Sequence, residues 1–392
     1  MKRLGEEKGI VLVMALLFLL VLGLLGMSAI ISTQYDNRIS GNKRVSEQAF
    51  YVAEAGIQEV LGRFREGATG EIEDTEPLYP NWKRFIALSP DQAAKVGYVS
   101  SNPSQFLQSL QNQLDFAVEL RHKVNIANAV VTRDGNPVYL MASLGVTQEG
   151  GRKSIEVELD PRPNLGAGGA LYSEKPVDLL GTSTYIQGMD ACGTNHVPGV
   201  AITLPDDPMN DPVDTNGSPT VEGSPEDIQY ETPNRNLKEM VEYIRKDANF
   251  RYAYGSNQTL TGMSEQWGIP SGSGTTTPLS YSGALNIVYF NMGGDKTLKL
   301  AGGSHGAGIL LVDGNLEING GFKWYGLIIV TGALDFTGGG EKNITGGVMT
   351  GESATVEVDV GGNAGIINCS AVRPQLENLV APVRMVRWRE VY

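Results

Sequence analysis

The sequence predicts an α+β protein that combines a long amino-terminal helix, an antiparallel β-sheet and a glycine-rich carboxyl-terminal domain of stacked strands. The helix is predicted by an uncharged apolar run at residues 10–31 that continues into an amphipathic stripe. The sheet is predicted by two apolar segments that flank a glycine turn near residue 150. The stacked strands are predicted by a segment of 13 residues that recurs 18 positions later in the chain.

The composition limits the classes of function. The chain has 392 residues, enough for two domains, and a formal net charge of -13. Binding to nucleic acid requires clustered lysine and arginine, so this excess of acid argues against a nucleic-acid partner. The three histidines, His122, His196 and His305, are too few and too scattered for a zinc site. We therefore expect neither a metal nor a cofactor.

The apolar run at residues 10–31 contains 22 residues and no charged side chain. As a helix it spans about 33 Å, which matches the thickness of one hydrocarbon core. Lys2, Arg3 and Lys8 precede the run. By the positive-inside rule the amino terminus then stays in the cytoplasm, and the rest of the chain is exported.

The segment after the run, residues 34–66, continues as an amphipathic helix. Its apolar residues recur along one face while charged residues occupy the others. The apolar face consists of Val45, Ala49, Ala53, Ile57, Leu61 and Phe64. A secretory signal peptide has a shorter apolar core that ends at a cleavage site, so the pattern argues against one. A plain single-span anchor with a stalk is the alternative that periodicity alone leaves open.

Two motifs in this part of the chain point to a family. Lys8-Gly9-Ile10, followed by the apolar run, resembles the leader of type IV prepilins. Residues 39–44, which read ISGNKR, and residues 49–57, which read AFYVAEAGI, resemble the PilX-type minor pilins. The resemblance covers about residues 8–65, and the leader and the second motif together are more specific than either alone.

The resemblance implies that a prepilin peptidase cuts between Gly9 and Ile10 and that Ile10 is then N-methylated. It implies a single-pass subunit of the inner membrane, with its amino terminus cytoplasmic and its bulk periplasmic, that later enters an extracellular pilus (fimbrium). The implied partners are the peptidase, the membrane and other minor and major pilins, which the helix would contact. The implied function is structural rather than enzymatic.

Met14 occupies the fifth position after the implied cleavage site, where major pilins carry glutamate. In a filament that glutamate offsets the positive amino terminus of a neighbouring subunit, and an unpaired buried charge there is costly. A subunit without the glutamate suits an end of the filament better than its repeating body. Met14 therefore favours a role at the pilus tip or in priming assembly. The alternative is that Met14 packs in lipid while another group supplies the charge.

The sequence divides into a leader at 1–9, a helix at 10–66 and a headgroup with antiparallel strands at 67–164. Residues 137–148 and 153–159 have the alternating pattern of strands, and residues 149–152 between them read EGGR, which is typical of a hairpin turn. A further strand is expected within residues 116–129. A long helix packed on such a sheet is the usual pilin headgroup, as the resemblance also implies.

The remaining residues, 165–392, are predicted to form a β-solenoid-like domain. Residues 309–321 align without gaps with residues 327–339, and 20 of the 49 glycines lie between Gly293 and Gly365. Short periods of apolar strands with glycine corners are typical of solenoids, in which neighbouring turns must stack to bury their apolar faces. The alternative is a set of hairpins in a sheet or sandwich. Residues 171–181 look like an isolated earlier turn, and residues 183–279 look like an inserted loop and helix region.

Two further sites are candidates. Because the domain is exported, Cys192 and Cys369 are expected to form a disulfide, the alternative being two buried thiols. Asp214 and Asn216 resemble part of a calcium loop, but Pro212 stands where the first ligand belongs. A solvated acidic loop is therefore the better interpretation of this segment, and calcium is a weak alternative.

The sequence contains no recognisable catalytic motif, and we predict no catalytic residue. The leading hypothesis is a minor pilin-like subunit at or near the pilus tip that primes assembly or presents a surface domain. The first alternative is a pilus-borne adhesin or glycan-binding module, with a tip adhesin as a further partner. A minor pseudopilin of type II secretion and a polysaccharide-active β-helix enzyme are the remaining alternatives, the enzyme by fold analogy alone.

Overall fold

The computed structural model describes residues 7–65, 72, 76–215, 217–263, 266–351, 358–361 and 363–391. These residues form two compact units. The first, called the head unit, comprises residues 7–131, 137–160 and 385–391, and the second, called the body unit, comprises residues 132–136 and 161–384. The two units are described separately below.

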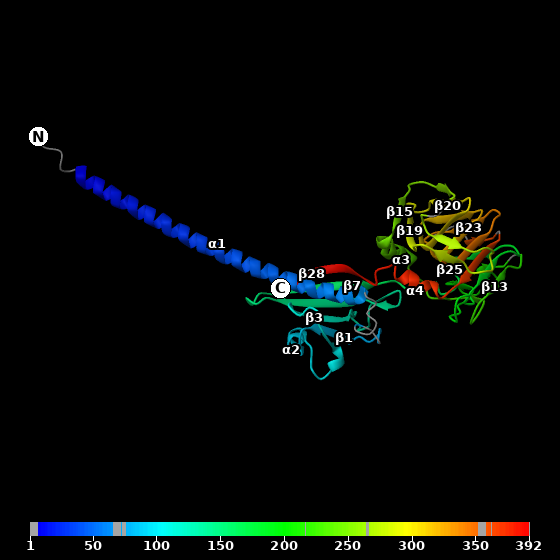
Figure 1. The fold of residues 1–392 in the computed structure, drawn as a ribbon, viewed down its shortest axis with the longest axis horizontal. Helices are drawn as coiled ribbons and strands as arrows, with labels where there is room; N and C mark the ends of the chain where they lie inside the picture. Colours follow the sequence, from blue (N-terminus) through cyan, green and yellow to red (C-terminus); the bar gives the residue numbers. More distant parts are fainter. Residues whose placement is uncertain are drawn as a thin grey trace. The chain divides into compact units, whose positions relative to one another are not determined.

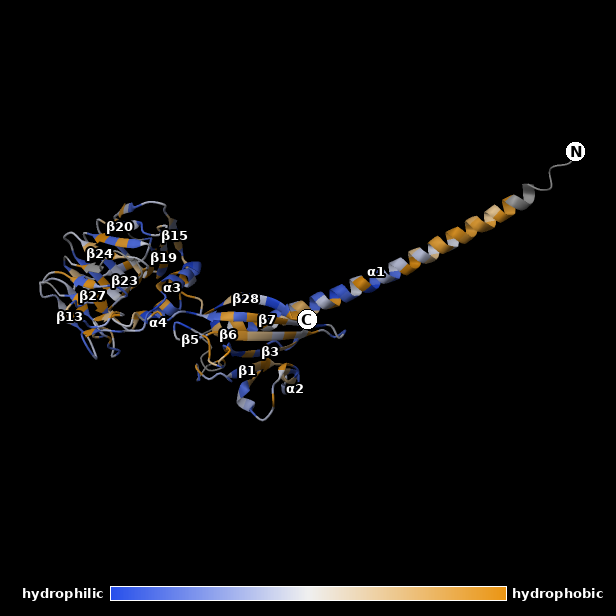
Figure 2. Cartoon of the chain, turned by 180° about the vertical axis from the view of Figure 1, so that it is seen from behind, coloured by the Kyte–Doolittle hydropathy of each residue, from blue (hydrophilic) through white to orange (hydrophobic). Residues whose placement is uncertain are grey.

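A single helix, α1 (Glu7–Arg65), begins the head unit and continues without a break for 59 residues (Figure 1). No proline interrupts it, so every turn can keep its backbone hydrogen bonds. Figure 2 shows its first half as almost uniformly apolar and its second half as mixed. Side chains from Val11 to Ser40 are all exposed, whereas Ala49, Ala53 and Ile57 are buried. The helix therefore has an unpacked apolar part and a packed amphipathic part.

The head unit contains one mixed sheet, with strand order β2-β1-β3-β6-β7-β28. The pair β1–β2 is parallel, and β1, β3, β6 and β7 pair antiparallel in that order. The expected hairpin is present, because β6 and β7 pair across a turn at residues 147–151. The strands are β1 (Lys83–Ala87), β2 (Phe106–Gln108), β3 (Asp115–His122), β6 (Tyr139–Val146), β7 (Arg152–Pro161) and β28 (Val383–Val391).

Helix α1 packs on β6 and β3 so closely that glycine is required at the contact. A Cβ atom on Gly145 would lie 2.2 Å from the carbonyl oxygen of Ala49, and a Cβ atom on Gly56 would lie 2.5 Å from Ser143 Oγ. Ser143 Oγ instead donates a hydrogen bond of 2.7 Å to the carbonyl oxygen of Ala53. The small residues of the AFYVAEAGI motif thus let the helix lie directly on the sheet.

The last strand lies elsewhere than the sequence division placed it. Residues 165–392 were expected to belong to one domain, but residues 385–391 of β28 extend the head sheet beside β7. Lys153 pairs with Glu390, and Arg389 with Glu156 at 2.6 Å. Such cross-strand ion pairs between residues far apart in sequence leave no local pattern, so the sequence did not reveal this strand.

The body unit consists mainly of two long parallel sheets. The larger sheet follows the path β13-β10-β27-β25-β23-β21-β19-β15, with β8, β11 and β14 attached, and the smaller follows β12-β9-β26-β24-β22-β20-β16. The larger sheet contains β8 (Leu171–Ser173), β10 (Tyr185–Gln187), β11 (Val200–Ile202), β13 (Thr220–Glu222), β14 (Ile228–Gln229), β15 (Phe250–Ala253), β19 (Asn286–Asn291), β21 (Ser304–Asp313), β23 (Phe322–Val330), β25 (Lys342–Thr350) and β27 (Ala364–Asn368). The smaller contains β9 (Val177–Leu179), β12 (Val213–Asp214), β16 (Gln258–Thr261), β20 (Thr297–Ala301), β22 (Asn315–Asn319), β24 (Leu334–Thr337) and β26 (Val358–Val360).

The remaining elements are short. They are α2 (Pro90–Ala93), η1 (Ala94–Val96) and η2 (Pro103–Gln105) in the head unit, and α3 (Leu237–Ile244), η3 (Arg245–Asp247), α4 (Val372–Glu377), β17 (Ile269–Ser271) and β18 (Ser280–Ser282) in the body unit, besides the bridge pair β4 (Thr132–Arg133) and β5 (Asn136–Pro137). Helix α3 lies within residues 183–279, for which the sequence suggested a region with a helix.

Residues separated by 18 positions stand side by side in the body unit. The register pairs Leu311 with Ile329 in one sheet and Leu316 with Leu334 in the other. Leu316 and Leu334 belong to a continuous core that includes Trp267, Phe290 and Trp324, whereas Leu311 and Ile329 belong to a second apolar cluster that includes residues of α3 and α4. The apolar positions that align in the sequence are thus the positions that meet in space.

Residues 183–279 do not form the separate loop and helix region that the sequence suggested. They supply β10, β11, β12, β13 and β14 next to β27, β8 and β9, and they supply β15 and β16 next to β19 and β20. Most of these strands have only two to four residues. Strands so short show no periodicity of their own, so only their pairing with distant strands reveals them.

The parallel strands of the body unit, called the stack, are interrupted where the chain enters and leaves this unit. On one side β25 pairs along its whole length with β23. On its other side two separate strands share it: β27 pairs with residues 342–346 and β8 with residues 348–350. Gly346 is the last residue of β25 that pairs with β27, and Gly347 therefore lies at the break between the end of β27 and the start of β8.

A column of acidic residues runs across the smaller sheet. The register places Glu317 beside Asp335, Asp335 beside Asp359, Asp359 beside Asp178, and Asp178 beside Asp214. Neighbouring strands lie about 4.8 Å apart. Lys299 binds Glu317 at 2.5 Å at one end of this acidic column. Like charges directly opposite each other in a sheet are destabilising.

We therefore expect Asp178→Asn to raise the free energy of unfolding by about 0.2–1 kcal/mol at low ionic strength, because it removes a charge beside Asp214 in the register. Urea titration at low and high salt measures this gain, which should shrink in high salt as screening increases. The matched control is Glu226→Gln, which removes an exposed carboxylate outside the column and should leave stability unchanged. Equal stabilisation by both substitutions would contradict the explanation.

Candidate functional site

The exposed half of α1 is the first candidate site. Within the described residues, one helix is long and apolar enough to cross a membrane, and none of its apolar window is buried inside the protein. Met14 lies in this part and is 64% exposed. Between Val11 and Tyr35 the helix carries no charged side chain, and Asp36 is the first. This surface can be buried only by lipid or by other apolar helices.

Two predicted site residues lie at the start of the helix. The backbone of Gly9 and Ile10 belongs to α1, whereas the side chain of Ile10 is not described. Cleavage after Gly9 and methylation of Ile10 therefore remain predictions from the sequence motif.

A buried ion pair fixes the other half of α1 to the sheet. Arg63 donates to Glu59 Oε1 at 2.8 Å and to the carbonyl oxygen of Gln108 at 2.8 Å. Glu59 in turn accepts from Ser109 Oγ at 2.7 Å and from the amide of Leu110 at 3.0 Å. The side chains of Glu59 and Arg63 are only 3% and 5% exposed. This cluster joins the end of the long helix to the edge strand β2.

The predicted pairing of the two cysteines is present. Cys192 and Cys369 form a disulfide whose Cα atoms lie 5.0 Å apart, and 177 positions separate them in the sequence. Cys192 follows β10, and Cys369 directly follows β27, which is the strand beside β10. The bond therefore ties the point where the chain leaves the stack to the neighbouring strand.

Asp190 reinforces the same point of the stack. Its carboxylate accepts hydrogen bonds from the amides of Cys192 at 3.0 Å, Asn195 at 2.8 Å and Ser370 at 3.0 Å. Burial raises the pKa of Asp190, but the hydrogen bonds from Ser370, Cys192 and Asn195 outweigh it and hold the pKa below the usual value of 3.8. The ionised carboxylate is thus part of the folded structure.

Asp190 should make the body unit sensitive to acid. Because its pKa is lower in the folded state, its contribution to stability is fully present above about pH 4 and is lost as the pH falls through the folded-state pKa. We expect Asp190→Asn to be less stable than the unsubstituted protein at pH 6, with the difference shrinking below pH 3. Urea titrations at both pH values measure this, and a difference that grows on acidification would contradict the assignment.

The weak calcium candidates are not assembled into a site among the described residues. Asp214 is exposed at the end of β12, and Asn216 lies outside the described residues. Within the part of the chain that the structure describes, no group of three or more His, Cys, Asp or Glu side chains could hold a metal ion.

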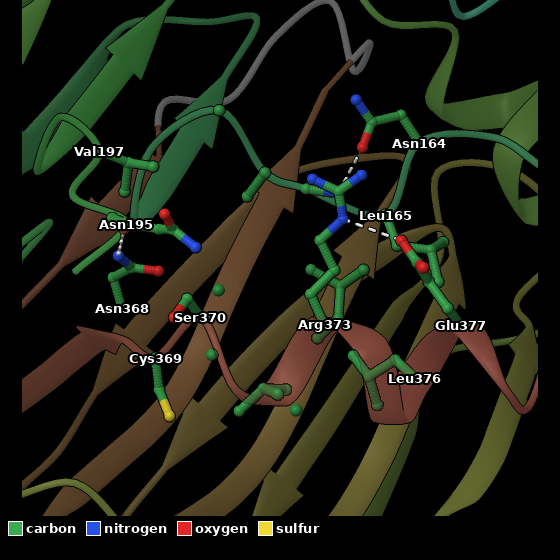
Figure 3. Close-up of a pocket in the computed structure, with 18 of the residues that line it drawn as sticks. Asn164, Leu165, Asn195, Val197, Asn368, Cys369, Ser370, Arg373, Leu376 and Glu377 are labelled. Atoms are coloured by element: carbon green, nitrogen blue, oxygen red, sulfur yellow. Dashed lines mark hydrogen bonds and ion pairs between the residues drawn. The ribbon is translucent and has the colours of Figure 1, made fainter. Parts of the chain in front are cut away.

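A pocket of about 550 Å³ opens beside the disulfide, within the body unit (Figure 3). Glycines at 326, 346 and 347 and Leu327 contribute its sheet wall, where the stack is interrupted. Residues 164–169 and α4 contribute two further walls, and Asn195 lies at the rim. Its charged lining residues are Arg235, Arg373 and Glu377.

The sequence did not predict the residues of this pocket. They come from four separate regions, near residues 165, 195, 235 and 370, and from the glycines of two strands. Only the pairing of β27 and β8 with one strand brings these regions together. The glycine surplus was visible, but it indicated turns rather than the wall of a pocket.

Comparison with known proteins supports the sequence resemblance. The family model PilX N-terminal matches residues 8–58. Among solved structures, the competence-associated pilin ComZ from Thermus thermophilus matches with 9% sequence identity and a TM-score of 0.28, covering 88% of this chain and 98% of that chain. A likeness of this size carries no argument about function, and no curated protein matches the sequence. The motifs, the long apolar helix and the family match agree, and residues 8–58 are therefore a PilX-type pilin N-terminal region.

Proposed function

We propose that the protein is a non-catalytic, minor type IV pilin-like subunit that is anchored by α1 and enters a filament through the same helix. The observation that carries the proposal is the division of α1. Its first half is apolar and exposed, and its second half is packed on an antiparallel sheet. A helix of this kind suits a bilayer first and a bundle of similar helices afterwards. Other pilins are accordingly the expected partners.

The test is amino-terminal sequencing of the protein recovered from membranes and from sheared filaments. We expect the mature chain to begin at Ile10, with a methylated amino group, after cleavage by a prepilin peptidase of the inner membrane. A Gly9→Val variant, which removes the small residue before the cleavage site, should stay unprocessed and absent from filaments. An intact chain in the cytosol, or a periplasmic chain without residues 10–31, would refute the proposal.

We propose further that the subunit lies at or near the pilus tip and primes assembly. Met14 supports this, because a methionine cannot pair with the amino terminus of a neighbouring subunit. We expect Met14→Glu to raise the number of copies per filament at least severalfold, since the subunit then fits the repeating body. Quantitative mass spectrometry of sheared pili measures the ratio to the major pilin, with Met27→Glu as a control that places the charge elsewhere in the helix. An unchanged ratio in the Met14 variant would contradict the tip position.

We also propose that the body unit is a β-solenoid presented on the filament, and that residues 1–9 are a leader distinct from the head unit. The parallel register at an offset of 18 supports this. Deleting residues 314–331, one full period, should leave a folded body with one fewer layer, whereas deleting residues 314–322 should unfold it. Unfolding of both variants would contradict a body built of equivalent layers.

A pilus-borne adhesin is the second candidate function. The observation that favours it is the pocket beside the disulfide, which combines an apolar wall with several polar and charged side chains. Its volume lies within the range of small-molecule sites. A tip subunit that also adheres would satisfy both proposals.

A further inference from the structure

The pocket lies where the stack of strands is interrupted, so part of its wall is backbone that no neighbouring strand covers. Asn368 ends β27 beside Gly346, and β8 begins with Leu171 beside Val348, so Gly347 of β25 lies between the two strands. A side chain on Gly347 would narrow the pocket, because its Cβ atom would lie 3.2 Å from the Cβ atom of Ala167, which also lines it. The hollow is therefore a consequence of the fold rather than of loose packing.

The charged groups around the pocket have a positive excess. Arg373 donates to Glu377 Oε1 at 2.9 Å, and Arg162 pairs with Glu377 Oε2 at 3.2 Å, so one carboxylate is shared by two guanidinium groups. Arg235 has Asp134 as an ion-pair partner at 3.8 Å. The charged residues that line the pocket are thus two guanidinium groups, those of Arg235 and Arg373, and one carboxylate, that of Glu377, in a protein whose overall charge is -13. A local positive excess on an acidic protein favours an anionic ligand.

Amide side chains supply the neutral polar groups of the pocket. The amide nitrogen of Asn368 donates to the carbonyl oxygens of Gly188 at 3.0 Å and Asn195 at 3.1 Å, which fixes the orientation of its amide. Figure 3 shows the amide of Asn164 close to the guanidinium of Arg373, which rises from α4 between Asn164 and Glu377. Asn195 is exposed at the opposite rim. Amides beside a guanidinium group can bind hydroxyl groups and a carboxylate of the same ligand.

We propose that this pocket binds an acidic saccharide unit, a hexuronate whose carboxylate lies at Arg373 and whose hydroxyl groups lie at the asparagine amides. Leu327, Val372 and Leu376 give the apolar surface against which a sugar ring can lie. A volume of about 550 Å³ holds about one or two sugar rings, which suits a terminal unit of a polysaccharide better than an extended peptide. The inference deepens the adhesin function proposed above and relies on it for its biological role.

The probe is trigalacturonic acid, titrated calorimetrically into the full chain in detergent, with neutral galactotriose as the comparison. We expect the acidic trisaccharide to bind at least about tenfold more tightly than the neutral one. Arg373→Gln keeps hydrogen-bond donors but removes the charge, and it should weaken binding at least about tenfold. Asn195→Ala should weaken binding severalfold, because it removes one amide at the exposed rim. Arg387→Gln, on β28 of the head unit, is the matched control and should bind like the unsubstituted protein.

The outcomes separate the alternatives. Equal binding of the neutral trisaccharide, unaltered binding by Arg373→Gln, or the absence of binding to trigalacturonic acid would each overturn the proposal. Preferential binding of a short peptide through its free carboxyl terminus would also overturn it and would assign the pocket to proteins. Melting curves of each variant identify a loss of binding that comes from unfolding. If Arg373→Gln is unfolded, the effect of Asn195→Ala on binding tests the proposal instead. Processing after Gly9 and incorporation into pili are measured separately, so failure of this proposal leaves the pilin-like function standing.

Discussion

Replacing Cys369 with serine should lower the free energy of unfolding of the body unit by about 2–5 kcal/mol. The disulfide closes a loop of 177 positions, and a loop of this length strongly restricts the unfolded chain. The substitution also removes the bond at the point where β27 leaves the stack, beside β10. We therefore expect the layers next to β27 to open first.

Urea titration followed by tryptophan fluorescence measures this loss, because Trp267 and Trp324 are fully buried in the core of the body unit. The double variant Cys192→Ser, Cys369→Ser controls for a reactive unpaired thiol and should match the single variant. Reduction of the unsubstituted protein should reproduce the loss, whereas a reducing agent should not affect the double variant. Unchanged stability of the double variant would show that β27 and β10 stay paired without the disulfide.

Replacing Arg63 with alanine should destabilise the head unit by about 3–5 kcal/mol, because it leaves the buried carboxylate of Glu59 without its cationic partner. The carbonyl oxygen of Gln108 also loses a donor, so the contact between α1 and β2 should loosen. Hydrogen exchange over the last turns of α1 and over residues 106–110 measures the loss in the head unit alone. Exchange in the body unit should stay unchanged.

The matched control is Lys43→Ala on the same helix. Lys43 lies 3.8 Å from Glu47, but both side chains are exposed, so its loss should cost no more than about 0.5 kcal/mol. A double replacement of Glu59 and Arg63 by leucine or methionine should recover part of the stability, since it removes the need to bury charge. Equal effects of the Arg63 and Lys43 substitutions would contradict the assigned role of the buried pair.

The sequence predicted the features that local patterns determine. The apolar run and the stripe from Val45 to Phe64 predicted one long helix, and α1 has that extent. The alignment of residues 309–321 with 327–339 predicted which residues stand beside each other, as Leu311 and Ile329 do. Export and the number of cysteines predicted the bond between Cys192 and Cys369. Each of these predictions needed only periodicity, composition or a count.

The features that the sequence missed depend on pairing between distant segments. In the sequence, β28 is an arginine-rich segment without a clear strand pattern, and only its pairing with β7 reveals it as a strand. The strands of residues 183–279 are too short to carry a period, and the pocket forms only because β27 and β8 share one neighbour. For the same reason Arg235 and Arg373 gave no signal as a pair. Long-range pairing costs loop-closure entropy and leaves no trace in a window of neighbouring residues.

The position of β28 has a consequence for biogenesis. Strand β7 ends at Pro161, but the strand that covers its outer edge is made only after residues 162–382 have been synthesised and translocated. During that interval β7 presents unpaired backbone groups, which are a template for pairing with other chains. We expect nascent or truncated chains that stop before Val383 to be prone to aggregation and to depend on chaperones. The nine residues of β28 would thus let only a completed subunit cover the edge of its sheet.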